Sequence, residues 1–270
     1  MNDILNLKGK IALITGGGGV LGSSMAEVLA KQGVIVGVLG LTIEKVEKTV
    51  EKIKNFGGEA FAVKGNVLNQ EELEDIRAHI LENYGRLDIL INAAGGNMPG
   101  ATIGPDQAIY DLKVGDLQKV IDLNIIGTML PSQVFSEIFA KQKTGVIINI
   151  SSASAQRPLT RVVGYSASKA AIDNFTKWMS VEMGSKYGEG IRVNAIAPGF
   201  FIGEQNRALL LTPEGKLTAR GEKIIDHTPM GRFGVPQDLD GALLFLCSDM
   251  SKFVTGTIVN IDGGFAASSI

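Results

Sequence analysis

The sequence contains very little cysteine and histidine, with one cysteine, Cys247, and two histidines among 270 residues. A single cysteine cannot form an internal disulfide, and two histidines are too few for a histidine-rich metal site. Neither sign of charge is in excess, because 26 lysines and arginines stand against 28 aspartates and glutamates. A protein this close to neutral has no broad field that attracts nucleic acid or an anionic membrane. We therefore expect no metal site and no nucleic-acid partner.

Long hydrophobic runs and export signals are missing as well. The longest apolar runs have the length of a strand, well short of the ~18 residues that a membrane helix requires. The first ten residues, MNDILNLKGK, do not place a basic segment before an apolar one, which is the layout of a signal peptide. We expect no membrane partner and a cytoplasmic location.

What the sequence does contain is a large hydrophobic fraction, 45%, and 34 glycines. A chain of this length and composition buries an ample core without disulfides or a structural metal. No linker-like or repetitive tract divides it. We expect one globular domain over residues 1–270.

Short apolar runs alternate with longer amphipathic segments along the sequence. Buried strands are indicated at residues 11–14, 34–39, 60–63, 89–92, 146–150, 191–195 and 257–261. Helices are indicated at residues 21–32, 44–55 and 71–83, and from Tyr165 past Trp178. Such alternation is typical of βαβ units on one parallel sheet, and strands without polar alternation are buried on both faces. The pattern predicts an α/β fold, a single-domain, Rossmann-type, doubly wound parallel sheet with helices on both faces.

Two irregular stretches, residues 97–114 and about 198–231, each follow a predicted strand. Ligands of open α/β sheets bind beyond the carboxyl ends of the strands. We therefore expect these stretches to form the walls of an active site, with residues 198–231 as the substrate loop.

A glycine-rich stretch, Thr15 to Gly22, lies between the first strand and the first helix. Glycines let the backbone approach a pyrophosphate, and the start of the helix offers N–H donors, so this setting predicts dinucleotide binding. A carboxylate after the second strand selects NAD and an arginine selects NADP, but the residues here are Gly40, Leu41 and Thr42. No basic residue stands in the glycine turn. The sequence favours NAD(H) and leaves NADP(H) open.

Tyr165 and Lys169 are four residues apart in a predicted helix and share one face. The phenol has an ordinary pKa of about 10, and an ammonium ~5 Å away contributes roughly 3 kcal/mol, about two pKa units. We expect Lys169 to lower the pKa of Tyr165 into a range useful for proton transfer to a carbonyl oxygen. Ser152 ends a strand 13 residues upstream of Tyr165 and is expected to hydrogen-bond the same oxygen.

Together these motifs resemble the short-chain dehydrogenase/reductase family over nearly the whole sequence. Thr15 to Gly22 is similar to its cofactor turn, and Asn92-Ala93-Ala94-Gly95 is similar to its motif after the fourth strand. The resemblance implies four catalytic residues: Tyr165 as the general acid/base, Ser152 orienting the carbonyl, Lys169 binding the nicotinamide ribose, and Asn124 holding a relay water. It implies a cofactor site formed by Gly16, Gly18, Gly19, Val20, Leu21, Gly22, Leu41, Asn66, Val67, Asn92, Ala93, Ala94, Tyr165, Lys169, Pro198 and Gly199.

Three positions depart from the pattern of that family. Val20 stands where a further glycine is usual, Asn66 where an aspartate near the adenine is common, and Gly203 where a threonine often bonds the carboxamide. Asn66 keeps hydrogen bonding but removes a charge, and Gly203 places the carboxamide contact in question.

Four segments, at residues 95–97, 122–133, 198–210 and 217–234, more narrowly resemble the D-mannonate oxidoreductases of this family, also called fructuronate reductases. The resemblance implies reduction of the C5 ketone of D-fructuronate to D-mannonate with NADH, in a dimer or, as we expect, a homotetramer. A sugar acid needs amides for its hydroxyls and an arginine for its carboxylate. The expected substrate-binding residues are Asn97, Ser152, Arg157, Gln205, Asn206 and Arg207.

Other functions remain open on the sequence alone. A gluconate 5-dehydrogenase, or a dehydrogenase of another sugar or polyol, would keep the same chemistry. A 3-oxoacyl reductase is less favoured, since the balanced charge indicates no basic surface for a carrier protein. A non-catalytic dinucleotide sensor is disfavoured because Tyr165 and Lys169 are both present.

Overall fold

All seven expected strands form, and they pair in parallel in one sheet. The computed structural model describes residues 4–203 and 206–268. The strands lie in the order β3-β2-β1-β4-β5-β6-β7. Their bounds are β1 Ile11–Thr15, β2 Ile35–Gly40, β3 Ala60–Lys64, β4 Ile89–Asn92, β5 Gly145–Ile150, β6 Ile191–Pro198 and β7 Ile258–Ile261. The order reverses between β1 and β4, and such a switch point is where open α/β sheets bind their ligands.

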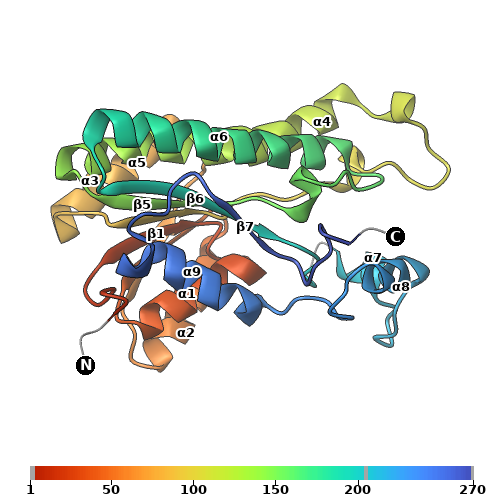
Figure 1. The fold of residues 1–270 in the computed structure, drawn as a ribbon, viewed down its shortest axis with the longest axis horizontal. Coiled ribbons are helices and arrows are strands. Elements are labelled where there is room, and N and C mark those ends of the chain that lie inside the picture. The colour runs from red at the N-terminus through yellow and green to blue at the C-terminus, as the bar shows by residue number, and fades with distance from the viewer. Residues whose placement is uncertain (1–3, 204–205, 269–270) are drawn as a thin grey trace.

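Helices cover both faces of the sheet (Figure 1). Their bounds are α1 Val20–Lys31, α2 Ile43–Asn55, α3 Gln70–Tyr84, α4 Val114–Ile121, α5 Gly127–Gln142, α6 Val163–Tyr187, α7 Arg207–Leu210, α8 Ala219–Asp226 and α9 Asp240–Cys247. Helices α1, α2 and α9 pack on one face, and α3, α5 and α6 on the other. The predicted doubly wound sheet is confirmed. Within the described parts of the protein, no helix combines the length and the hydropathy needed to cross a membrane.

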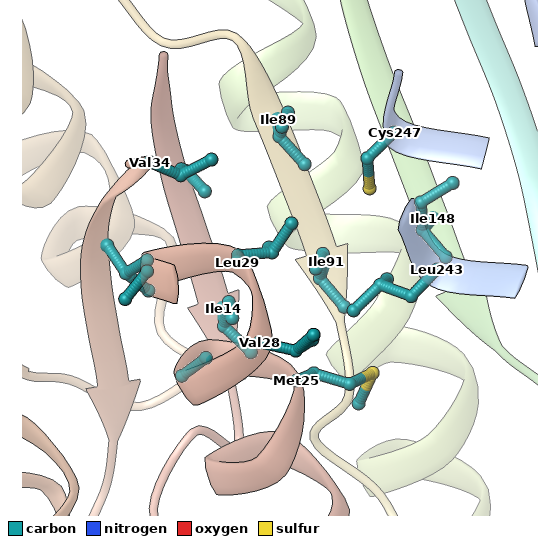
Figure 2. Close-up of a cluster of buried hydrophobic side chains, with 14 of the residues drawn as sticks. Ile14, Met25, Val28, Leu29, Val34, Ile89, Ile91, Ile148, Leu243 and Cys247 are labelled. Atoms are coloured by element: carbon teal, nitrogen blue, oxygen red, sulfur yellow. The ribbon is translucent and has the colours of Figure 1, made fainter. Parts of the chain in front are cut away.

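Strands β1, β4, β5 and β6 are buried at every position because they carry apolar residues on both faces of the sheet. On one face, Ile14 and Ile91 of the sheet pack against Met25 and Leu29 of α1, and Leu243 of α9 closes the same layer (Figure 2). Cys247 belongs to this layer, where burial raises the pKa of its thiol to about 12. A buried thiol with so high a pKa is a small hydrophobic side chain rather than a nucleophile.

The helices around the site differ from the expected pattern in two places. The segment 122–133 does not form one regular helix, because a π-helical turn, Asp122–Ile126, separates α4 from α5. The stretch 198–231 contains the short helices α7 and α8, which are too short for periodicity to indicate. The stretch 97–114 is irregular apart from two single 3₁₀ turns, Pro99–Ala101 and Ile109–Asp111, and its last residue, Val114, begins α4.

A series of buried polar side chains joins the sheet to α5 and α6. The amide of Asn92 on β4 donates to the hydroxyl of Ser132 on α5, at 2.8 Å, and to Oδ1 of Asn149 on β5, at 2.9 Å. The amide of Asn149 then donates to Oγ1 of Thr176 on α6, at 2.9 Å. Buried hydrogen-bond networks specify a unique packing. These contacts therefore set the position of α6 on the sheet.

Thr176→Val should lower the free energy of unfolding by about 1–3 kcal/mol, because it keeps the shape of the side chain but leaves the buried amide of Asn149 without an acceptor. Urea denaturation measures the change. Ser136→Ala is the control, since that hydroxyl bonds a carbonyl of its own helix near the surface; its effect should stay below ~0.5 kcal/mol. Equal stability of Thr176→Val and the wild type would show that this polar network does not hold α6.

Candidate active site

Ser152, Tyr165 and Lys169 come together where β5 ends and α6 begins. Ser152 follows β5, is 8% exposed, and accepts hydrogen bonds from the N–H and O–H of Ser154 at 3.2 and 3.0 Å. Tyr165 lies in the first turn of α6, and Lys169 follows one turn later. Nζ of Lys169 is 5.5 Å from the centre of the Tyr165 ring. The structure thus brings together the three residues selected from the sequence.

Lys169 is a buried lysine, 4% exposed. Its Nζ donates a hydrogen bond to the carbonyl of Ile150, at 2.7 Å. Burial lowers the pKa of Lys169 from 10.5 to about 8, and the carboxylate of Asp173 on the same helix acts in the opposite direction. The ammonium is therefore held at a defined place, with two of its three protons left for other acceptors.

The pKa of Tyr165 moves in the direction opposite to the expected one. Burial raises it, and the neighbouring Ser152 hydroxyl offsets only part of the rise. The expectation that Lys169 lowers this pKa is wrong for the protein alone, because burial penalises the charged forms of both groups. Lys169 also directs a hydrogen bond to Ile150.

Asn124 lies in the π-helical turn and is completely buried. Its amide donates to the carbonyls of Gly96 and Val120, at 2.7 and 2.8 Å, and its Oδ1 accepts from the N–H of Gly96, at 3.0 Å. A Cβ at Gly95 would lie 2.8 Å from that Oδ1 and 3.3 Å from Nζ of Lys169. The side chain of Asn124 thus holds the loop after β4 against Lys169. Its part in a water relay stays a prediction.

The glycine turn is packed so closely that it has no room for side chains. Gly16 has a φ of +65°, and a Cβ there would lie 2.8 Å from the carbonyl oxygen of Ala93. A Cβ at Gly22 would lie 2.3 Å from the carbonyl oxygen of Gly16. No side chain caps the start of α1, where Gly19 is the N-cap residue. The first N–H groups of α1 are therefore suited to bind a phosphate group, as the dinucleotide hypothesis requires.

The other predicted cofactor residues lie around the ends of the neighbouring strands. Thr15 ties β1 to the loop after β4, because its hydroxyl accepts from the N–H groups of Ala93 and Ala94, each at 3.1 Å. Gly18 packs on α2, where a Cβ would meet Lys45. The remaining residues lie at the start of α1, after β2 and β3, and at the end of β6: Val20, Leu21, Leu41, Asn66, Val67, Pro198 and Gly199. Asn92 differs from these, since its amide is directed into the core.

The predicted substrate residues differ in their surroundings. The guanidinium of Arg157 donates to the carbonyl of Phe265, at 3.0 Å, and Asn206 bonds Phe201 and Gly203 within its own loop. Arg207 is exposed at the start of α7. Gln205 lies outside the described residues. The structure therefore gives Arg157 and Asn206 roles in holding loops.

Among the predicted substrate residues, Asn97 has the geometry best suited to binding a ligand. Its amide donates to the hydroxyl of Thr102 at 2.6 Å, and that hydroxyl donates onward to the carbonyl of Met98, which fixes the orientation of the amide. Its Oδ1 is buried and has no partner among the described residues. A buried acceptor without a donor is suited to a ligand hydroxyl.

Comparison with known proteins identifies the family. A sequence model described as enoyl-(acyl carrier protein) reductase matches residues 19–266. An uncharacterised oxidoreductase of Bacillus subtilis, UxuB, is 46% identical over 273 residues, which cover 98% of this chain and 97% of that protein. The chain belongs to the short-chain dehydrogenase/reductase family.

Solved structures of other family members share the whole fold. A proposed D-mannonate oxidoreductase from Haemophilus influenzae, with NAD bound, superposes with a TM-score of 0.91 at 44% identity, covering 98% of each chain. A 7α-hydroxysteroid dehydrogenase complexed with NADH and 7-oxo glycochenodeoxycholic acid superposes with a TM-score of 0.84 at 32% identity, covering 98% of this chain and 97% of that one. This short-chain dehydrogenase/reductase is an oxidoreductase that acts on alcohol groups.

Two arginines that the sequence interpretation did not consider lie on the connections that follow β5 and β6. Arg161 precedes α6, and Arg220 lies in the first turn of α8. Burial and the charge of Arg161 lower the pKa of Arg220. The only sequence signal was the position of Arg220 within the stretch 198–231. No motif marks either residue.

The buried Lys169 should make stability depend on pH. Its pKa in the folded protein, about 8, is below the usual 10.5. Between pH 8 and pH 10.5 the unfolded protein therefore binds more protons than the folded protein. The free energy of unfolding consequently rises with pH in this range. Relative to that of Lys169→Met, the free energy of unfolding of the wild type should rise by about 3 kcal/mol between pH 8 and pH 10.5. Urea denaturation at several pH values measures this difference.

Lys177→Met is the matched control, because Lys177 is an exposed lysine on the same helix. Its difference from the wild type should be the same at every pH in that range. A difference between wild type and Lys169→Met that stays constant with pH would show that Lys169 keeps an ordinary pKa.

Proposed function

We propose that this short-chain dehydrogenase/reductase reduces the C5 ketone of D-fructuronate to D-mannonate with NADH, reversibly. The observation that carries the proposal is the similarity to the NAD-bound Haemophilus influenzae structure over the full chain, which includes the segments around the substrate. The meeting of Ser152, Tyr165 and Lys169 at one strand end supports the chemistry.

The glycine turn fits a dinucleotide because the start of α1 carries no side-chain cap and a Cβ at Gly16 or Gly22 would collide with backbone. Gly16 to Gly22 would hold the pyrophosphate, and Leu41, Asn66 and Val67 would surround the adenosine. Pro198 and Gly199 would stand beside the nicotinamide, with Lys169 at its ribose. The bound cofactor supplies the hydride that the ketone carbon accepts.

Proton transfer is the part of the reaction that the protein itself performs. Tyr165 keeps its proton at neutral pH, since burial raises its pKa, and the phenol therefore serves as the acid that protonates the ketone oxygen. Ser152 accepts two hydrogen bonds from Ser154, which leaves its own proton to donate to the same oxygen. The buried charge of Lys169 stabilises the tyrosinate that forms.

A polyhydroxy substrate also explains the free acceptor of Asn97. Its Oδ1 is buried without a partner in the described residues, which costs free energy until a donor arrives. A hydroxyl of a sugar acid provides that donor.

A panel of ketones tests the function. Absorbance at the NADH band should fall rapidly with D-fructuronate and much more slowly with 5-ketogluconate or an uncharged ketose, and NADPH should be the poorer reductant. Tyr165→Phe should lower kcat by at least about a hundredfold, because it removes the general acid, while NADH affinity measured by fluorescence stays within about twofold. Activity with 5-ketogluconate alone would replace the proposed substrate and retain the mechanism.

We also propose that the protein forms a homotetramer. Two separate surfaces expose large apolar side chains: Trp178 and Val181 on α6 are 59% and 67% exposed, and Phe253 and Met250 before β7 are 104% and 49% exposed. Monomers rarely leave such groups in water on two faces. Two distinct twofold interfaces generate a tetramer.

Light scattering after size exclusion tests the assembly. The wild type should have four times the mass of the 28.6 kDa chain. Trp178→Lys and Phe253→Glu should each give a dimer, and the double variant a monomer, because each substitution removes the apolar contact of one interface. A monomeric wild type would refute the tetramer without affecting the proposed reaction.

A further inference from the structure

Helix α6 carries three polar residues at intervals of four, Tyr165, Lys169 and Asp173. Residues with this spacing are neighbours on one side of a helix. The proposed reaction uses Tyr165 and Lys169 and leaves Asp173 without a role. Asp173 is only partly exposed, and burial raises the pKa of its carboxyl group. A carboxylate kept in such a place costs free energy, so the contacts that it makes are informative.

The carboxylate of Asp173 is bound to the strand end at which the proposed site lies. Its Oδ1 accepts a hydrogen bond from the hydroxyl of Ser151, the residue that follows β5. The same hydroxyl lies 3.5 Å from the carbonyl oxygen of Lys169. The N–H of Ser151 donates to the carbonyl of Ile196 on β6, at 2.8 Å. Ser151 therefore joins the strand end to both β6 and α6, and Asp173 is its partner on the helix.

Ser151 stands between two residues that belong to the proposed site. The residue before it, Ile150, offers the carbonyl that accepts from Nζ of Lys169 at 2.7 Å. The residue after it is Ser152, the proposed donor to the ketone oxygen. Consecutive residues are joined by planar peptide groups. A hydrogen bond that fixes Ser151 consequently restricts the movement of both neighbours.

Asp173 also supplies a negative charge close to the Lys169 ammonium. Among the described residues, Lys169 makes no ion pair, and the carboxylate that acts on it is that of Asp173, one helical turn away. The titratable groups beside these two are Tyr165 and Lys177, both on α6. The polar groups that approach from the strand end and from the π-helical turn are an uncharged hydroxyl and an uncharged amide.

We propose that Asp173 is a positioning residue of the reaction, which fixes the strand end through Ser151 and serves as the counter-charge of the buried Lys169 ammonium. It acts through Ser151 and Lys169 rather than on the substrate. The charge of Lys169 stabilises the tyrosinate that forms when the ketone oxygen is protonated. The enzyme should therefore stay active to a higher pH with Asp173 than without it. The inference rests on the proposed function for the reaction that Asp173 assists.

The pH dependence of stability tests the counter-charge without any substrate. The effect of Lys169→Met on the free energy of unfolding is measured by urea denaturation in two backgrounds, the wild type and Asp173→Asn. In the wild-type background this effect should begin to grow near pH 8, the pKa of Lys169. In Asp173→Asn it should begin to grow about one pH unit lower, because the ammonium has lost one nearby, partly exposed negative charge.

Glu182→Gln is the matched control, since Glu182 is an acid of the same helix that pairs with Lys186. In that background the effect of Lys169→Met should still begin to grow near pH 8. An effect that begins at the same pH in Asp173→Asn as in the wild type would overturn the counter-charge.

The pH profile of kcat tests the role in the reaction, with D-fructuronate or whichever ketone the wild type reduces. The alkaline loss of kcat should begin about one pH unit lower in Asp173→Asn, and Asp173→Glu, which restores the charge, should recover at least about half of that shift. Ser151→Ala keeps the charge but removes the contact, so it should lower kcat by about three- to tenfold without moving the profile. An equal shift in Asp173→Glu, or an unchanged kcat in Ser151→Ala, would contradict the proposed role.

The two kinds of measurement keep this inference apart from the proposed function. If the wild type does not reduce D-fructuronate but Asp173→Asn moves the pH at which the effect of Lys169→Met begins, the proposed function fails and the counter-charge stands. If the wild type reduces D-fructuronate and Asp173→Asn moves neither that pH nor the kcat profile, the reverse holds.

Discussion

The buried ammonium of Lys169, bound to the carbonyl of Ile150, is the constraint on which the site depends. A lysine in such surroundings is stable only when its donors have defined acceptors, because burial removes the water that would otherwise solvate it. The contact joins the end of β5 to the first turns of α6. Asn149 and Thr176 make a second connection between the same two elements, further along the helix. Together they allow little freedom in the position of Tyr165.

The backbone of the turn after β1 is constrained as well, because its neighbours leave no space for side chains. Gly16 and Gly22 are required because β4, the turn and α1 approach one another more closely than a Cβ permits. That approach brings the uncapped start of α1 to the strand ends where Ser152 and Tyr165 lie. In the proposed function, one closely packed edge of the sheet thus provides phosphate donors, a proton donor and a buried charge. A sheet whose order reverses between β1 and β4 makes room for a ligand at that edge.

The proposed catalytic residues and the proposed substrate-binding loops differ in how their side chains are held. Ser152, Tyr165 and Lys169, the proposed catalytic residues, lie at the end of β5 and on α6, whose contacts are buried and hydrogen-bonded. The residues that we propose to face the substrate lie on the stretches 97–114 and 198–231. Within them, Asn206 holds its own loop, whereas Oδ1 of Asn97 has no partner among the described residues. Unsatisfied groups at a strand end are informative because burial without a partner is costly. They indicate the ligand that the frame alone does not specify.

The sequence by itself determined the sheet, the helices that cover it and the pairing of Tyr165 with Lys169, because these depend on local periodicity and on spacing within one helix. The glycine turn was predictable for the same reason. The rest was decided by contacts between segments far apart in the sequence. Only the tertiary structure directs the Asn92 amide into the core and Arg157 toward Phe265, and only burial by neighbouring elements raises the pKa of Tyr165. Arg161 and Arg220 are 59 positions apart, so no local pattern could have indicated that the charge of one lowers the pKa of the other.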